Sequence, residues 1–373
     1  MAENKALVQS DSSAQSKQSI GSQPANQSPA TSKGSRRSSG GITRMLKGMS
    51  TIHEKATPRS RHKQKSSHDP VNHPAKKPSP KKQNPDDPLG SKGGRVSKSY
   101  TRKEMLKVIE ITKETMGKIL SKTELEGTRF SFVANKHTVV RLKPDSVEFP
   151  DLTTVVKVVP GDTYDRALEM QDAGNASDHM PVCVLNFANA HTPGGGWLNG
   201  ARAQEEQLCY RSTLIGALQP RLYPMEDLEC LYSPNVIVYR KSADNGYSFM
   251  SADDKLHLNP SVSVISMAAR KSPALTADKS TYIDQGQRQL MKDKMRLILR
   301  TAAVNNHRRL VLGALGCGAF RHPTQQVADC WKEVLGKVEF KGWFEQIQFV
   351  IRDGPYENNL AVFTKTLDGL NLG

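Results

Sequence analysis

Apolar residues along this chain form two kinds of pattern. Short runs rich in Val, Ile and Leu recur at residues 155–159, 182–188, 236–240, 261–266, 309–315 and 347–351. Because the apolar positions in these runs are mostly consecutive and do not strictly alternate with polar ones, they indicate strands covered on both faces. Other segments repeat apolar residues three and four apart, most clearly from Asp284 to Ala303. Alternating strands and helices predict a three-layer α/β/α fold with a mostly parallel mixed sheet.

The ordered part of the chain is predicted to begin near residue 98. Thr101 and Glu104 have the spacing of a helix capping box, and apolar residues follow them at helical spacing. We therefore assign residues 98–373 to one folded domain that opens with a helical extension. Its parallel strands predict a ligand site beyond their carboxyl ends.

Residues 1–97 have the composition of a disordered basic tail. The first hundred residues carry 19 Lys and Arg against 6 Asp and Glu, whereas the other 273 carry 34 against 31. The tail is rich in Ser, Lys, Gln and Pro, and it has too few large apolar residues to offset the entropy of ordering. Its basic runs fit a solvated linker, an import signal or a dock for polyanions, including weak contact with nucleic acid.

The cysteine spacing and the short apolar runs argue against a zinc-binding, disulfide-rich, membrane-spanning or secreted protein. The five cysteines have no spacing typical of a zinc site or a disulfide framework, and no candidate metal cluster accompanies them. No apolar run is long enough to span a membrane, and the N-terminus lacks the apolar block of a secretory signal. We expect an intracellular monomer, nuclear and/or cytoplasmic, that uses no metal and no cofactor.

A glycine-rich loop followed by two carboxylates is the first candidate site. The apolar run 182–188 leads into Gly194, Gly195 and Gly196, and Gln204, Glu205 and Glu206 follow after seven residues. Three consecutive glycines allow positive φ angles or close approach of a ligand to the backbone, and exposed amides favour phosphate or ribose oxygens. Glycines alone fit an ordinary loop equally well.

The two carboxylates favour hydrolysis of a glycosidic bond. That reaction needs a proton donor for the leaving oxygen, and partial burial beside another carboxylate raises the pKa of such a donor. Adjacent helical residues point about 100° apart, so Glu205 and Glu206 cannot flank one bond as the acid and base of an ordinary glycosidase do. One glutamate must supply the proton while the other orients a sugar.

The segment LNFANAHTPGGGWLNGARAQEEQLCYRSTL closely resembles the signature of the microbial-type poly(ADP-ribose) glycohydrolases, a family of catalytic macrodomains. The resemblance implies metal-independent hydrolysis of ribose–ribose bonds in poly(ADP-ribose) or on ADP-ribosylated proteins. It implies that Glu206 is the general acid and Glu205 holds a ribose hydroxyl, while Gln204 positions the loop. It also implies substrate contacts for Asn186, Asn189, Gly194, Gly195 and Gly196.

A second glycine-rich loop, LGALGCGAFRHP at residues 312–323, follows the run 309–315 and precedes a predicted helix. Such a turn suits a phosphate cradle, although packing alone can select it. Its sequence resembles that of the second phosphate loop of the same family. By that resemblance Gly316, Cys317, Gly318 and Ala319 offer amides to the diphosphate and Phe320 lies near the ribose, although Phe320 also fits an ordinary core aromatic.

Some questions stay open at this level. Asp162 suits a helix cap better than an adenine contact, and His191 suits a solvated loop position. A module that binds ADP-ribose without cutting it, or a hydrolase of other ADP-ribose derivatives, also fits a macrodomain. The sequence does not distinguish cleavage within the polymer from cleavage at its end, nor show whether the protein-linked unit is removed, what the tail does, or whether this chain is active.

Overall fold

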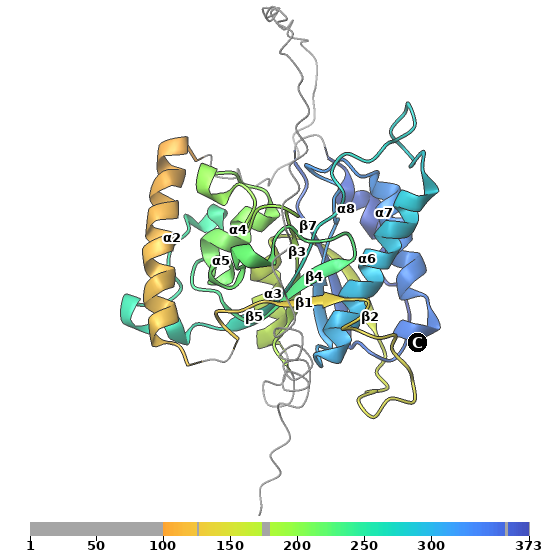
Figure 1. Ribbon diagram of the computed structural model, residues 1–373, viewed down its shortest axis with the longest axis horizontal. Helices are drawn as coiled ribbons and strands as arrows, with labels where there is room; N and C mark the ends of the chain where they lie inside the picture. Colours follow the sequence, from red (N-terminus) through yellow and green to blue (C-terminus); the bar gives the residue numbers. More distant parts are fainter. Residues whose placement is uncertain (1–99, 125–126, 174–179, 355–356, 373) are drawn as a thin grey trace, which may run out of the picture. The chain divides into compact units, whose positions relative to one another are not determined.

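The computed structural model describes residues 100–372 except for 125–126, 174–179 and 355–356 (Figure 1). The predicted tail, residues 1–97, therefore lies outside the described residues. In chain order the helices are α2 (Arg102–Lys122), α3 (Thr163–Asp172), α4 (Gln204–Arg211), α5 (Leu214–Ala217), α6 (Gln285–Val304), α7 (Thr324–Leu335) and α8 (Asn359–Leu367). The strands are β1 (Phe132–Asn135), β2 (Val155–Pro160), β3 (Cys183–Phe187), β4 (Glu229–Ile237), β5 (Ser261–Met267), β6 (Arg309–Leu312) and β7 (Gln346–Ile351).

These strands form one sheet in the order β1-β4-β5-β3-β6-β7-β2. The five strands from β5 to β2 are parallel, whereas β4 pairs antiparallel with both β5 and β1. The predicted mostly parallel mixed sheet is confirmed. Because parallel strands end at the same edge, the loops after β2, β3, β5, β6 and β7 gather there.

The sheet is the middle of three layers. In Figure 1, α2 and α4 lie on one side of it and α6, α7 and α8 on the other. Successive residues of the central strands point to opposite faces. Leu185 packs with the core that contains α6 and α7, whereas its neighbour Val184 packs with the core that contains α3 and α4. Burial on both faces explains why these strands are nearly continuous apolar runs.

The predicted N-terminal capping box is confirmed. The Thr101 hydroxyl accepts a hydrogen bond from the Glu104 amide, and the Glu104 carboxylate accepts one from the Thr101 amide, at the start of α2. The Thr112 hydroxyl on the same helix donates to the Tyr210 carbonyl in α4, at 3.3 Å. The helical extension therefore packs against the helix that carries the two glutamates.

Two strands depart from the sequence prediction. Only Val236 and Ile237 of the run 236–240 belong to β4, which begins seven residues before the run, at Glu229, and ends at Ile237. Pro234 concealed that start, because proline cannot donate to a ladder and is confined to edges and bulges. The register of β4 against β5 shifts between Ser233 and Val236, which makes room for this proline. Strand β1 was also missed, because its four residues are too short for periodicity to detect.

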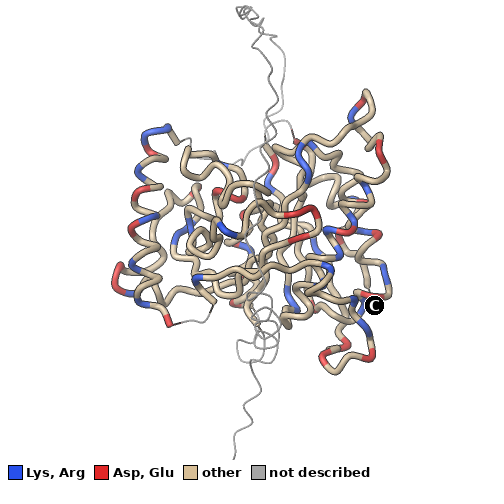
Figure 2. Tube along the Cα trace, viewed as in Figure 1, with Lys and Arg blue, Asp and Glu red and all other residues tan. Residues whose placement is uncertain are grey.

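Charge is evenly mixed on the described domain. Basic and acidic positions intersperse along α2 and along the outer helices on the opposite side (Figure 2). This agrees with the nearly balanced charges after residue 100. Among the described helices, none combines the length and apolar character that a membrane crossing requires.

Candidate functional site

A cavity of about 540 Å³ lies at the carboxyl edge of the sheet. Its walls include residues that end or follow five strands, namely Gly161 after β2, Phe187 in β3, Ala269 after β5, Gly316 after β6 and Arg352 after β7. Strand β3 continues toward α4 on one face of the sheet, and its neighbour β6 continues toward α7 on the other. A crevice opens where neighbouring strands send their connections to opposite faces, and it lies beyond the carboxyl ends of the strands, where the sequence predicts a ligand site.

The glycine loop after β3 makes a turn with left-handed backbone angles. Gly194 and Gly195 have φ angles of +68° and +57°, a region that costs other residues energy. A Cβ at Gly194 would lie 2.8 Å from both Ile215 and Trp197, so this glycine serves packing. The Tyr210 hydroxyl reaches the carbonyls of Trp197 and Ala201, each at 2.8 Å, and so ties the loop to α4.

Gly195 brings both glutamates against the loop. A Cβ at this position would lie 2.6 Å from Glu206 Oε1 and 2.7 Å from Glu205 Oε2, so a side chain cannot replace the glycine without moving a carboxylate. The Gly196 amide donates to Glu206 Oε1 and the Asn189 amide donates to Glu205 Oε2, each at 2.8 Å. One oxygen of each carboxylate is therefore fixed by the loop backbone.

The other oxygens of the pair have no partner in the described structure. Glu205 Oε1 and Glu206 Oε2 are buried without a hydrogen bond there, although both residues line the cavity. Burial penalises the charged form and raises the pKa of Glu205 to about 8, the charge of Glu206 acts in the same direction, and the Asn189 amide opposes it. Burial therefore favours the protonated form of Glu205, and a hydrolytic site can use a proton held in this pair.

Gln204 substitutes for a strand neighbour of β3. Strand β3 pairs with β6 only through Cys183 and Val184, so its last residues lack a partner on that side. The Gln204 side chain accepts from the Phe187 amide at 2.9 Å and donates to the Leu185 carbonyl at 2.7 Å. These bonds satisfy two backbone groups that face the same way and fix the first turn of α4 relative to the sheet.

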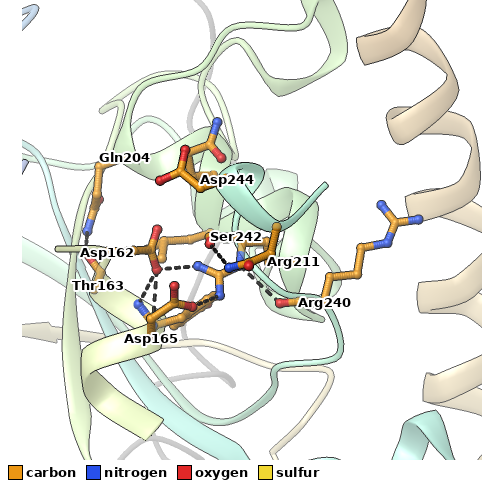
Figure 3. A network of polar contacts seen from close by, with 12 residues as sticks. Asp162, Thr163, Asp165, Gln204, Arg211, Arg240, Ser242 and Asp244 are labelled. Carbon is orange, nitrogen blue, oxygen red and sulfur yellow. Dashed lines mark hydrogen bonds and ion pairs between the residues drawn. The ribbon is translucent and has the colours of Figure 1, made fainter. Parts of the chain in front are cut away.

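A buried arginine joins the far end of α4 to the start of α3 (Figure 3). Arg211 is only 1% exposed, and its guanidinium pairs with Asp162 and Asp165. Asp162 also caps α3 by accepting from the amides of Tyr164 at 2.9 Å and Asp165 at 3.2 Å, which confirms the predicted cap. The Arg211 Nε donates to the Arg240 carbonyl at 3.1 Å. These ion pairs hold the end of α4 against the start of α3 beside the cavity.

The second glycine loop follows β6. Gly316 has a φ of +80°, and a Cβ there would lie 2.6 Å from the His322 ring, while the His322 amide donates to the Gly316 carbonyl. His322 Nε2 lies 2.6 Å from the Arg270 carbonyl, so Nε2 holds the proton and Nδ1 accepts from Tyr282. A Cβ at Gly318 would lie 3.8 Å from Glu357 Oε1, an ordinary van der Waals contact, so packing does not require glycine at that position.

The structure brings most of the predicted residues together. Nine line the cavity: Asn189, Gly195, Gln204, Glu205, Glu206, Gly316, Gly318, Ala319 and Phe320. Four others do not line it: Asn186, Gly194, Gly196 and Cys317. Asn186 is fully buried and donates to the Ser266 hydroxyl at 3.0 Å. The Gly196 amide is engaged by Glu206, and the Asn189 side chain caps its own loop by accepting from the His191 and Thr192 amides.

Sequence reasoning missed several lining residues, among them Arg202, Ala269, Arg352 and Glu357. Arg352 directly follows the run 347–351, so the rule that ligands bind at the carboxyl ends of strands could have identified it. Arg202 lies between the glycines and the glutamates, where its charge was a usable signal. In the portion of the chain that is described, no group of three His, Cys, Asp or Glu side chains could hold a metal ion.

Comparisons with known proteins agree with this geometry. Residues 96–241 match the family model of the microbial-type PARG catalytic domain, where PARG denotes poly(ADP-ribose) glycohydrolase. No curated protein matches the chain in sequence. The fold is similar to that of poly(ADP-ribose) glycohydrolase from Thermomonospora curvata, bound to the inhibitor ADP-HPD, with a TM-score of 0.57 and 24% identity over 71% of this chain and 99% of that one.

A second similar structure is a mutant of poly(ADP-ribose) glycohydrolase from Deinococcus radiodurans in complex with ADP-ribose. Its TM-score is 0.51 and its identity 24%, over 65% of this chain and 98% of that one. At this identity the two structures establish the fold, and they confirm the macrodomain-like architecture predicted above.

Proposed function

We infer that this chain, whose residues 96–241 match the family model of the microbial-type PARG catalytic domain, hydrolyses ribose–ribose O-glycosidic bonds in poly(ADP-ribose) and releases ADP-ribose. The similar solved structures hold ADP-ribose or the inhibitor ADP-HPD. The observation that carries the proposal is the pair of buried glutamates pressed against Gly195 at the edge of a large cavity. Mere binding of ADP-ribose does not need two carboxylates with unpartnered oxygens.

In the proposed reaction, Glu206 gives its proton to the leaving ribose oxygen as the bond from that oxygen to the anomeric carbon breaks. The electron pair of the bond stays with the leaving oxygen, and the anomeric carbon develops oxocarbenium character. Water then adds to that carbon and returns a proton to the carboxylate. Glu205 holds a ribose hydroxyl through a hydrogen bond at its unpartnered Oε1.

The raised pKa of Glu205 supports the presence of a proton in the pair before substrate binds. The roles of proton donor and sugar-orienting group require separate tests, because the raised pKa belongs to Glu205, whereas the family resemblance assigns the general acid to Glu206. The hydrogen bonds from the Asn189 and Gly196 amides hold the two carboxylates in different orientations. That arrangement fits one proton donor and one sugar-orienting group.

The loops fit the remainder of an ADP-ribose unit. Neighbouring strands are about 4.8 Å apart, so the glutamates beyond β3, the glycine loop beyond β6 and the Gly161 turn beyond β2 span roughly 14 Å. We place the diphosphate at the amides of the loop after β6, Phe320 near a ribose, and the adenosine toward Gly161 and Asp162. The amides of the glycine loop suit phosphate oxygens.

Incubation of purified full-length protein with poly(ADP-ribose) of defined length tests the proposal. We expect free ADP-ribose as the product, identified by mass spectrometry. Intact polymer after prolonged incubation with protein that still binds ADP-ribose would favour the alternative of a binding module. Release of ADP-ribose only from derivatives that lack a ribose–ribose bond would favour a hydrolase of another class.

We also propose that the basic N-terminal tail, which lies outside the described residues, assists capture of the polyanionic substrate and contacts nucleic acid weakly. Its charge of 19 basic against 6 acidic residues over the first hundred positions supports this role. The proposed setting is the nucleus, the cytoplasm or both, and the basic runs fit an import signal.

A further inference from the structure

Basic side chains are scarce around the cavity. Among the described residues that line it, the acidic ones are Asp162, Glu205, Glu206 and Glu357, and the basic ones are Arg202 and Arg352. A ligand with two phosphates meets a wall that is mostly acidic. The positions of Arg202 and Arg352 therefore influence where the phosphates bind.

Arg352 is held by a single, exposed carboxylate. Its Nη2 donates to both carboxylate oxygens of Asp244, at 2.9 and 3.1 Å. One nitrogen thus serves both oxygens, and within the described residues Nε and Nη1 have no partner. The side chains are 45% and 31% exposed, and exposed pairs of this kind contribute little to stability. A stronger anion can displace Asp244.

The place of Arg352 in the sheet brings it near the second glycine loop. It directly follows β7, the strand beside β6, and the loop that contains Gly316 follows β6. The two segments start about 4.8 Å apart, a distance that an arginine side chain easily spans. The glutamates lie beyond β3, on the other side of that loop and roughly 10 Å from Arg352 by strand spacing. Arg352 is thus nearer the proposed diphosphate than the scissile bond.

Asp244 comes from the opposite wall. It lies in a short 3-10 helix, Ala243–Asn245, whose first residue lines the cavity and whose carbonyl there accepts from the Tyr100 hydroxyl at 3.0 Å. Figure 3 shows Asp244 on the segment that continues from Ser242 and the Arg211 network. The Arg352–Asp244 pair therefore joins the end of β7 to this wall at the edge of the cavity.

We propose that Arg352 is a phosphate-binding residue of the cavity, held by Asp244 until a diphosphate takes the place of that carboxylate. A guanidinium bonds phosphate through a pair of nitrogens, either Nη1 with Nη2 or Nε with Nη2, so either pairing requires the Nη2 that Asp244 holds. Asp244 competes with the ligand for the same cation. The identity of the ligand as ADP-ribose rests on the proposed function.

Competition predicts opposite effects for the two partners, measured as the Kd of ADP-ribose by calorimetry. Arg352→Met removes the contact and should raise Kd about tenfold, since a charge-assisted hydrogen bond of 1.4 kcal/mol corresponds to that factor. Asp244→Asn removes the competitor and should lower Kd roughly two- to fivefold. The double variant should match Arg352→Met, because Asp244 acts only through Arg352.

Two controls isolate the phosphate contact. Lys332→Met removes one positive charge from an exposed position on α7 and should leave Kd unchanged. Adenosine, which has no phosphate, should bind the Arg352 and Asp244 variants as it binds the unmodified protein. Weaker ADP-ribose binding in both single variants, or no change in either, would overturn the proposal and leave the pair a structural tie. Failure of the unmodified protein to bind ADP-ribose at all would overturn the proposed function as well.

Discussion

Replacement of Gly195 by alanine tests whether the glycine loop positions the two glutamates. Gly195 has a φ of +57°, and its added Cβ would lie 2.6 Å from Glu206 Oε1 and 2.7 Å from Glu205 Oε2. Ordinary van der Waals contact begins at 3.4 Å, so the Glu206 and Glu205 carboxylates must move by about 0.8 and about 0.7 Å. The hydrogen bonds from the Asn189 and Gly196 amides would then lengthen or break.

The expected magnitudes separate the backbone effect from the site effect. An alanine in the left-handed region costs roughly 1–2 kcal/mol, which lowers Tm by about 2–8 °C for a domain of this size. A misplacement near 1 Å costs on the order of 100-fold in rate, so kcat on short poly(ADP-ribose) oligomers should fall about 100-fold. Binding of ADP-ribose should weaken less than kcat.

Gly369→Ala is the matched control. Gly369 has a φ of +70° and no atom within 4 Å of its added Cβ, and it follows α8, outside the cavity lining. It should lose similar stability while keeping its kcat. Melting by differential scanning fluorimetry and initial rates of ADP-ribose release give both quantities. If folded Gly195→Ala protein keeps a kcat within threefold of the Gly369→Ala value, the loop does not position the glutamates as described.

Four further predictions follow from the site and the tail. Glu206→Gln should lower kcat by roughly 100- to 10,000-fold while the Kd of ADP-ribose changes less than about tenfold, and Glu205→Gln should also lower kcat; an unimpaired rate removes the residue concerned from the mechanism. Because burial raises the pKa of Glu205 above its value in the unfolded chain, protonation of Glu205 stabilises the folded state at acidic pH, and this stabilisation is lost as the pH rises toward about 8. Glu205→Gln should therefore reduce the fall in Tm between pH 5 and 8, and parallel Tm curves for the variant and the unmodified protein would contradict this. EDTA should leave polymer hydrolysis intact, and activity lost on chelation but restored by a divalent ion would indicate another class of hydrolase. Deletion of residues 1–95 should preserve turnover of short oligomers and flatten the salt dependence of binding to long polymer, whereas superimposable salt titrations would leave the tail as a linker or import signal.

Local chemistry is what the sequence alone could determine. The capping box at Thr101 and the Asp162 cap follow from groups a few residues apart, and β3, β5 and β7 follow from apolar runs that any covered strand requires. The glycine loop and Glu205–Glu206 lie within one segment, so their association was visible before any fold was known. The resemblance to a family rested on that same segment.

Tertiary structure decided the features that depend on residues distant in the chain. Gln204 completes the hydrogen bonding of β3 because β6 diverges from it, Arg211 reaches Asp162 across 49 positions, and Arg352 meets Asp244 across 108. Periodicity and spacing describe neighbours along the chain, and they do not show which distant side chains come into contact when the sheet forms. The raised pKa of Glu205 has the same origin, since burial by several separate segments produces it.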